Sequence, residues 1–276
     1  MKDYFLLIKR DLQTGFQHAK NNFIILLILT LFFLLYPVLL LKTYDQNSYY
    51  SYLDTLLIGI GGVPIELVIQ HSFKFPFLWL FIQLSLILIM NTWARTDIIN
   101  FSSFTRIRIR KVYLLIISKY TCTFIITFIY CSLTFLLTFC LCSLFGIHST
   151  NYTEYTLHTL NFSDFKMPYL QLTWFVILLN FSSVLCAVFL FTTLSIMMKP
   201  VYAFLILTAW YVLSIFRDSF VFIGNLSMVL RQPLFHQNVF ASIMITLLVQ
   251  VIIILICIIT SIIYLNKKDI IGDSID

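Results

Sequence analysis

The run Thr105-Arg-Ile-Arg-Ile-Arg-Lys-Val-Tyr113 decides how this chain is arranged. It holds Arg106, Arg108, Arg110 and Lys111, in a protein with only 18 lysines and arginines among 276 residues. Apolar segments long enough to cross a lipid bilayer lie before and after it. Basic loops between two spans stay on the cytoplasmic side of a membrane. The run therefore predicts a cytoplasmic loop over residues 94–119, from which the sides of all other segments follow.

Composition places the chain in a membrane. Sixty per cent of its residues are apolar and 11% are charged, and its mean hydropathy is +0.95. A soluble domain carries roughly a quarter charged residues. We therefore predict an all-α, polytopic protein of the cell membrane. The chain is rich in Ile, a usage shared by proteins of low-GC bacteria, and we expect the membrane to be a bacterial plasma membrane.

Six apolar segments are predicted to span the membrane within one transmembrane domain, residues 1–276. They lie near residues 23–41, 77–93, 120–145, 174–198, 201–223 and 240–265. Lys267 and Lys268 follow the last segment and keep the C-terminus inside. Six spans then place both termini in the cytoplasm.

The N-terminal segment Asp3–Lys20 carries apolar residues three and four positions apart, which is one helical stripe. These are Phe5, Ile8, Leu12, Phe16 and Ala19. A helix of this kind lies in the membrane surface. The alternative is a soluble helix packed on a partner.

Two outer segments are ambiguous. Leu53–Gln70 is apolar but includes Asp54, Glu66, three glycines and Pro64, and an additional crossing there would move the basic loop outside. We predict a re-entrant or interfacial helical hairpin within the outer segment 42–76. Segment 217–239 is predicted to continue the fifth span as a helix, bend near Gly224 and return toward the membrane.

The charge distribution argues against nucleic acid as a partner. By this topology 13 of the 18 basic and 6 of the 12 acidic residues lie inside, so the inner side carries +7 and the outer side −1. That asymmetry orients a membrane protein and makes no patch for a phosphate backbone. The lipid bilayer is the predicted surrounding.

Apart from Arg217 and Asp218 toward the outer end of the fifth, the predicted spans contain no Asp, Glu, Lys or Arg in their interiors. Ion-driven transport usually requires such groups, so a proton relay is disfavoured. The polar residues Gln83, Asn180 and Gln250 are interpreted as hydrogen-bonding between helices. The other interpretation is that some of them line a substrate path.

Signatures of catalysis are absent from the sequence. It has no HExxH motif, no paired-cysteine spacing and no Gly-rich phosphate loop with its lysine, so we expect no metal, no cofactor and no ATPase activity in this chain. A membrane-embedded enzyme remains an alternative, resting on Glu66, His71, Glu154 and His158 in the outer segments. His148 and His158 share one loop with Glu154, but solvated side chains explain that spacing equally well.

The basic loop carries the functional hypothesis. Within it, Ile98, Phe101 and Phe104 recur at three-residue spacing and predict a short amphipathic helix ahead of the arginines. One interpretation is a docking site for an acidic or cleft-bearing cytoplasmic partner. The other is that the cations set topology and contact anionic lipid headgroups. The residues alone favour neither.

The whole layout resembles the permease subunits of ABC-2 type exporters. In that family an interfacial helix precedes six spans, and the loop between spans two and three forms a coupling helix followed by a basic run and a lysine opening span three. Thr105, Arg106, Arg110, Lys111 and Lys119 match that pattern here. Arginines that alternate with isoleucines depart from it.

The resemblance implies an exporter that this chain forms with a second permease subunit, in a homodimer or heterodimer. A separate cytoplasmic ATP-binding subunit would bind and hydrolyse ATP. It would dock on Asp97, Phe101, Phe104, Thr105, Arg106, Arg108, Arg110 and Lys111. Small permeases of this layout often export, or confer immunity to, peptide antibiotics. A non-catalytic membrane anchor or sensor subunit is a further alternative.

Overall fold

The computed structural model describes residues 2–44, 50–70, 74–90, 96, 112–147, 149, 151–153, 156, 168–217, 219, 222–231 and 239–267. These residues form helices and the connections between them, with one isolated β-bridge between Ser51 and Ser149. The predicted all-α class is confirmed for this part of the chain.

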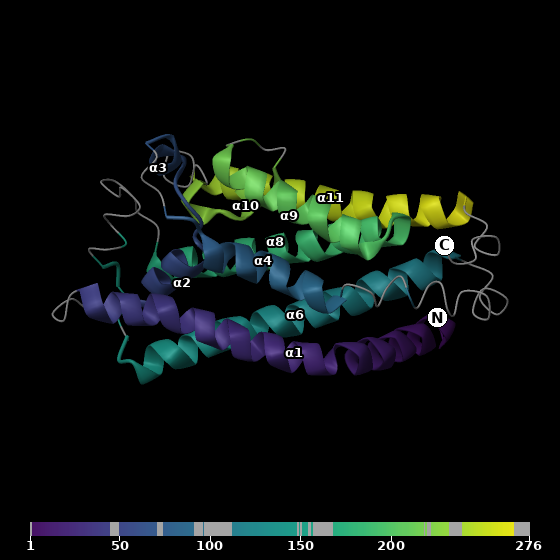
Figure 1. Ribbon diagram of the computed structural model, residues 1–276, viewed down its shortest axis with the longest axis horizontal. Coiled ribbons are helices and arrows are strands. Elements are labelled where there is room, and N and C mark those ends of the chain that lie inside the picture. The colour runs from purple at the N-terminus through teal and green to yellow at the C-terminus, as the bar shows by residue number, and fades with distance from the viewer. Residues whose placement is uncertain are drawn as a thin grey trace.

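The main helices form an elongated bundle in which consecutive helices run in opposite directions (Figure 1). They are α1 (Lys2–Tyr44), α4 (Phe77–Met90), α6 (Val112–Leu144), α8 (Tyr169–Met197), α9 (Pro200–Phe216) and α11 (Val239–Lys267). The start of α1, the start of α6 and the end of α11 lie together at what we call the terminal end. Four short elements, α2 (Tyr52–Ile60), α3 (Ile65–Ile69), α10 (Ile223–Ser227) and the 3-10 turn η1 (Val229–Arg231), lie toward the opposite, distal end.

Four helices of the described chain are long and apolar enough to cross a membrane. Their apolar stretches are Lys20–Thr43, Tyr113–Leu144, Tyr169–Met197 and Met244–Lys267. Helices α4 and α9 are apolar but shorter, with 14 and 17 residues. At 1.5 Å per residue they measure roughly 21 and 25 Å, against about 30 Å for the hydrocarbon core of a bilayer. The length and apolar composition of these helices therefore indicate a membrane protein.

The predicted N-terminal interfacial helix is wrong as a separate element. Helix α1 continues without a break through 43 residues, about 65 Å at 1.5 Å per residue. Neither proline nor glycine occurs in Lys20-Asn-Asn-Phe23 to turn the chain. The first turns of α1 pack instead on α6, where the Tyr4 hydroxyl lies 3.0 Å from Thr121 Oγ1. The buried face of this segment carries Leu7 and Asp11, whereas Phe5 and Phe16 of the predicted stripe are exposed.

Two predicted boundaries also change. The loop predicted over residues 94–119 ends by Val112, because Val112–Lys119 forms the first two turns of α6. The span predicted over residues 201–223 ends at Phe216, and α10 begins separately at Ile223. The bend predicted near Gly224 is thus wrong, since the chain leaves the helix at Arg217. A side chain on Gly224 would collide with Ser214 and Trp79, so this glycine lets α10 approach α9.

Arg231 holds this distal break together. Its guanidinium donates to the carbonyls of Ser214 and Ile215, each at 2.5 Å, and to that of Val63 at 2.8 Å. The last carbonyls of a helix lack partners within it and carry partial negative charge. Arg231 therefore caps α9 and ties its end to the connection after α2.

The predicted outer hairpin forms two helices, α2 and α3, separated by Gly61–Pro64. Helix α2 is buried between the long helices. Gly62 has a φ of +83°, which favours glycine, and a side chain there would collide with Met228. The connection thus packs directly on η1, and the Leu230 N–H donates to the Gly61 carbonyl at 3.1 Å.

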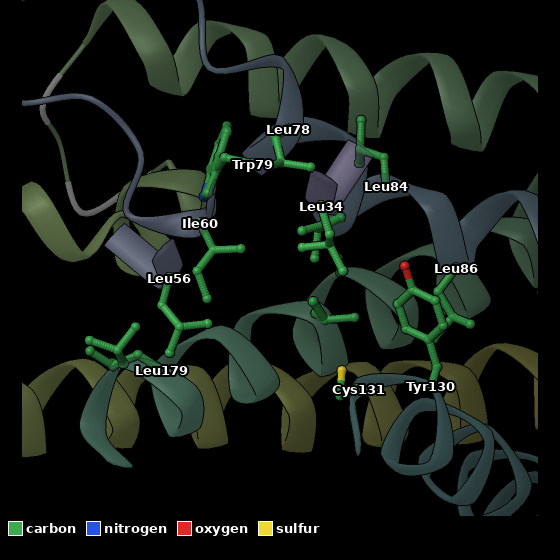
Figure 2. Close-up of a cluster of buried hydrophobic side chains, with 14 of the residues drawn as sticks. Leu34, Leu56, Ile60, Leu78, Trp79, Leu84, Leu86, Tyr130, Cys131 and Leu179 are labelled. Atoms are coloured by element: carbon green, nitrogen blue, oxygen red, sulfur yellow. The ribbon is translucent and has the colours of Figure 1, made fainter. Parts of the chain in front are cut away.

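The main hydrophobic core lies where α2 and α4 meet α1, α6 and α8. Figure 2 shows side chains from these helices converging, with Leu56 and Ile60 of α2 beside Trp79 of α4 and Leu34 of α1 nearby. Trp79 and Tyr130 are among the largest fully buried side chains. Short helices α2 and α4 are thereby fixed between the long ones.

Candidate functional site

The predicted docking residues, Asp97, Phe101, Phe104, Thr105, Arg106, Arg108, Arg110 and Lys111, lie outside the described residues. What the structure describes is the place where the chain leaves that loop, at Val112, and the two helical turns that follow. A buried charged cluster lies on these turns. It joins α6 to the first turns of α1.

The cluster is centred on an ion pair between Asp11 of α1 and Lys119 of α6. The Lys119 ammonium donates to Asp11 Oδ1 at 2.9 Å. The exposed fraction is 0% for the Asp11 side chain and 1% for that of Lys119. Buried ions are stable only where charges are paired and the remaining lone pairs accept hydrogen bonds.

Neighbouring groups complete the coordination of the Asp11 carboxylate. Ser118 Oγ donates to Oδ2 at 2.5 Å, and Arg10 Nη2 donates to Oδ1 at 2.7 Å. Cys122 Sγ contacts the Asp11 backbone carbonyl at 3.4 Å. The Arg10 side chain is 29% exposed, so Arg10 lies at the protein surface. One carboxylate thus holds two cations, one buried and one at the surface.

The ion pair connects segments far apart in sequence, which is why sequence reasoning missed it. Asp11 and Lys119 are 108 positions apart, and each taken alone resembles a solvated charge near a span end. One signal was present: Lys119 is the only charged residue between Val112 and Ile147. A lone cation within so long an apolar helix requires a buried anion.

A second buried carboxylate lies at the distal end. Asp54 of α2 has an exposed fraction of 0%. Its carboxylate accepts from the Ser51 N–H at 2.7 Å while the Asp54 N–H donates to Ser51 Oγ at 3.3 Å, which is a capping box at the start of α2, and Ser51 Oγ also donates to the carboxylate at 2.8 Å. Thr153 Oγ1 donates to it at 2.8 Å, and Thr156 Oγ1 donates as well. All these partners are neutral, and no ion pair to Asp54 occurs in the described part of the chain.

A buried tyrosine accompanies this distal carboxylate. Tyr52 of α2 donates from its hydroxyl to the Phe135 carbonyl at 3.2 Å. This hydrogen bond ties the start of α2 to α6.

The polar residues predicted to bond between helices do so in part. Ser183 Oγ of α8 donates to Gln83 Oε1 of α4 at 2.9 Å. Gln250 Nε2 of α11 lies 3.4 Å from the Leu226 carbonyl of α10. The Asn180 amide nitrogen is buried and has no hydrogen-bond partner among the described residues.

The residues on which an enzyme would rest are not brought into a described site. His71, His148, Glu154 and His158, and the side chain of Glu66, lie outside the described residues. Where side chains are described, no group of three or more His, Cys, Asp or Glu residues is placed to hold a metal ion.

Comparison with protein-family models, with curated proteins and with solved structures gives no match to this chain.

Proposed function

We propose that this chain is the membrane-spanning permease subunit of an ATP-driven exporter of the ABC-2 type. A separate cytoplasmic ATP-binding subunit would supply the energy, and a second permease subunit would complete the transport path. The proposal places the chain as a multi-pass protein in the bacterial plasma membrane. It rests on the resemblance in layout and on the charged cluster beside the basic loop.

The proposed topology has six spans with both termini in the cytoplasm. The alternating directions of α1, α4, α6, α8, α9 and α11 support it (Figure 1). Helix α4 is short, but all its described side chains from Ile82 to Ile87 are buried. Non-helical backbone at membrane depth is tolerated where protein surrounds it. Helices α4 and α9 are each too short to cross the bilayer alone. Because α2 and α10 are buried in protein, α2 can therefore complete the crossing of α4, and α10 that of α9.

The observation that carries the proposal is the Asp11–Lys119 pair at the base of the loop. A partner that pushes on residues 97–111 would act directly on the first turns of α6. Because the Lys119 ammonium is held 2.9 Å from the Asp11 carboxylate, those turns would move together with α1. A docking event would thus reach two long helices at once, which suits a subunit whose energy comes from outside.

The proposed cargo is a peptide antibiotic, which the complex would export or remove to protect the cell. This part of the proposal derives from the resemblance alone. No side-chain pattern in the described spans selects a particular substrate.

The test is purification of the full-length protein from native membranes in mild detergent, with an ATPase assay on the proteins that co-purify. We expect a stoichiometric ATP-binding subunit with the wild type. Replacing Arg106, Arg108 and Arg110 together by Ser is expected to abolish its recovery.

The matched control replaces three exposed cations at the distal end, Lys42, Lys74 and Arg217, by Ser. It removes the same charge and is expected to leave co-purification intact. Recovery of no ATPase with wild type, even after cross-linking, would refute the exporter. A stoichiometric partner without ATPase activity would indicate an anchor or sensor subunit instead.

A further inference from the structure

The first turns of α6 contact three other helices. Ser118 and Lys119 bind Asp11 of α1, as described above. Successive residues of an α-helix point about 100° apart, and Tyr120, the next residue, contacts α8 and α11 instead. These contacts lie at the terminal end of the bundle, where α6 begins and α11 ends (Figure 1).

Hydroxyl groups from three helices meet at Tyr120. The Tyr120 hydroxyl lies 2.7 Å from Thr193 Oγ1 of α8 and 2.7 Å from Ser261 Oγ of α11. Both distances are typical of O–H···O hydrogen bonds. The three residues are buried, with exposed fractions of 2%, 6% and 0% for Tyr120, Thr193 and Ser261. We call these three residues the Tyr120 chain.

The donors and acceptors of the Tyr120 chain can be put in order, because each hydroxyl has one proton. Thr193 Oγ1 donates to the Phe189 carbonyl of its own helix at 2.9 Å, so it accepts from Tyr120, which in turn accepts from Ser261. The contacts of Tyr120 and Thr193 with the Cys257 carbonyl are longer, at 3.3 and 3.4 Å. Hydrogen bonds therefore run from α11 through α6 to α8, and bonds in such a chain strengthen one another.

Apolar packing surrounds the Tyr120 chain but cannot replace it. The rings of Tyr120 and Phe189 lie 4.8 Å apart between centroids, and Ile116 and Leu265 belong to the same buried cluster. Burial of apolar surface is non-directional, so packed helices can slide against one another. Hydrogen bonds require a fixed distance and angle. The Tyr120 hydroxyl therefore fixes the position of α6 along α8 and α11.

We propose that Tyr120 is a positioning residue that transmits movement of the first turns of α6 to the ends of α8 and α11. Lys119 transmits the same movement to α1, so one turn of α6 acts on three neighbouring helices. The inference rests on the proposed function for the partner that moves the basic loop, whereas the hydrogen-bonded chain itself does not depend on it. Docking of an ATP-binding subunit would thereby reach the last helix of the chain.

Tyr130 provides a matched control on the same helix. It lies about 15 Å further along α6 and is also buried, with an exposed fraction of 0%. Its hydroxyl lies 2.8 Å from Ser85 Oγ of α4. Tyr120→Phe and Tyr130→Phe therefore remove the same buried hydroxyl and keep the ring, but only the first breaks the connection to α8 and α11.

The first experiment is hydrogen–deuterium exchange of the full-length protein in detergent micelles, followed by mass spectrometry. It needs no partner subunit. We expect Tyr120→Phe to raise amide exchange over Cys257–Leu265 of α11 several-fold, because a helix end that loses its contacts opens more often. Tyr130→Phe should leave this segment unchanged. Equal exchange there in wild type and Tyr120→Phe would overturn the proposal, whether or not the chain belongs to an exporter.

The second experiment repeats the exchange measurement on the complex with the co-purified ATP-binding subunit, without nucleotide and with ATP plus vanadate. In wild type we expect nucleotide to change exchange both in the first turns of α1 and at the end of α11. Tyr120→Phe should keep the change in α1, which depends on Lys119, and lose the change in α11. A merely structural role would not separate the two segments.

Tyr130→Phe should keep both changes. A response of α11 that persists in Tyr120→Phe, or that is missing from the wild-type complex, would overturn the proposal. Failure to recover any ATP-binding subunit refutes the exporter instead, and the first experiment alone then decides whether Tyr120 holds α8 and α11 to α6.

Discussion

The two ends of the bundle each bury one carboxylate, and they stabilise it in different ways. At the terminal end Asp11 pairs with the cations of Lys119 and Arg10. At the distal end Asp54 is held by neutral groups, the Ser51 backbone N–H and the hydroxyls of Ser51, Thr153 and Thr156.

The difference lies in what each site fixes. The positive partial charge at the start of α2 favours the Asp54 carboxylate, so Asp54 is stabilised by its own helix and by a nearby connection. Asp11 lies in the third turn of α1, away from the start of the helix, and its local cation, Arg10, has a side chain that is 29% exposed. It depends on a cation from another helix. The terminal end therefore locks two long helices together, whereas the distal end anchors a connection.

The largest expected effect follows from removing the buried cation. Lys119→Met should lower the free energy of unfolding by about 3–5 kcal/mol, because the Asp11 carboxylate is then left buried without its main counter-charge. Denaturant unfolding in detergent micelles would measure the loss.

Adding Asp11→Leu to Lys119→Met should restore most of that stability, because an apolar pair can replace a buried ion pair. A double variant no more stable than the single one would show that the pair is not what stabilises this end.

The same substitution at both ends sharpens the comparison. Asp11→Asn leaves the Lys119 ammonium buried and unpaired, so we expect a loss of about 3 kcal/mol or more. Asp54→Asn leaves no unpaired charge but weakens hydrogen bonds from neutral donors to a carboxylate, so about 1.5–3 kcal/mol should be lost. Unfolding of both variants under one set of conditions tests this order. Equal losses would mean that the charge of the partners does not matter.

The smallest expected effect concerns one donor to Asp54. Thr153→Val removes a hydroxyl that donates to Asp54 Oδ1 at 2.8 Å, and about 1 kcal/mol of stability should be lost. Thr138→Val is the control, because the buried Thr138 hydroxyl bonds only to the Thr134 carbonyl of its own helix. If Thr138→Val lowers stability as much as Thr153→Val does, the loss comes from removing any buried threonine hydroxyl and not from the bond to Asp54.

Much of the fold followed from the sequence. Apolar runs predicted the helical class and each of the six main helices of the described chain, because their signal is continuous and local. Boundaries were less accurate where a helix runs beyond its apolar part, as α1 does before Lys20 and α6 does before Tyr120. Hydropathy identifies the residues whose side chains favour a lipid environment. The helix itself continues beyond them for as long as its backbone hydrogen bonds can form.

The candidate site was predictable only in outline. The run of arginines indicated a loop of functional interest, and its docking role stays a prediction. The partnership of Asp11 with Lys119 left no local pattern, since it depends on two helices meeting. The polar residues Gln83 and Asn180 were recognised as unusual, but the bond from Ser183 to Gln83 appears only once α4 and α8 are placed together.

The sequence by itself determined that this is a helical membrane protein with a concentrated basic loop, because those properties depend on residues adjacent in the chain. A backbone in lipid must satisfy its own hydrogen bonds, so a long apolar run is bound to be a helix. Only the tertiary structure decided which charges are buried and which polar atoms lack partners. Those outcomes depend on contacts between residues more than a hundred positions apart, such as Asp11 with Lys119, and the packing of the helices alone brings them within reach.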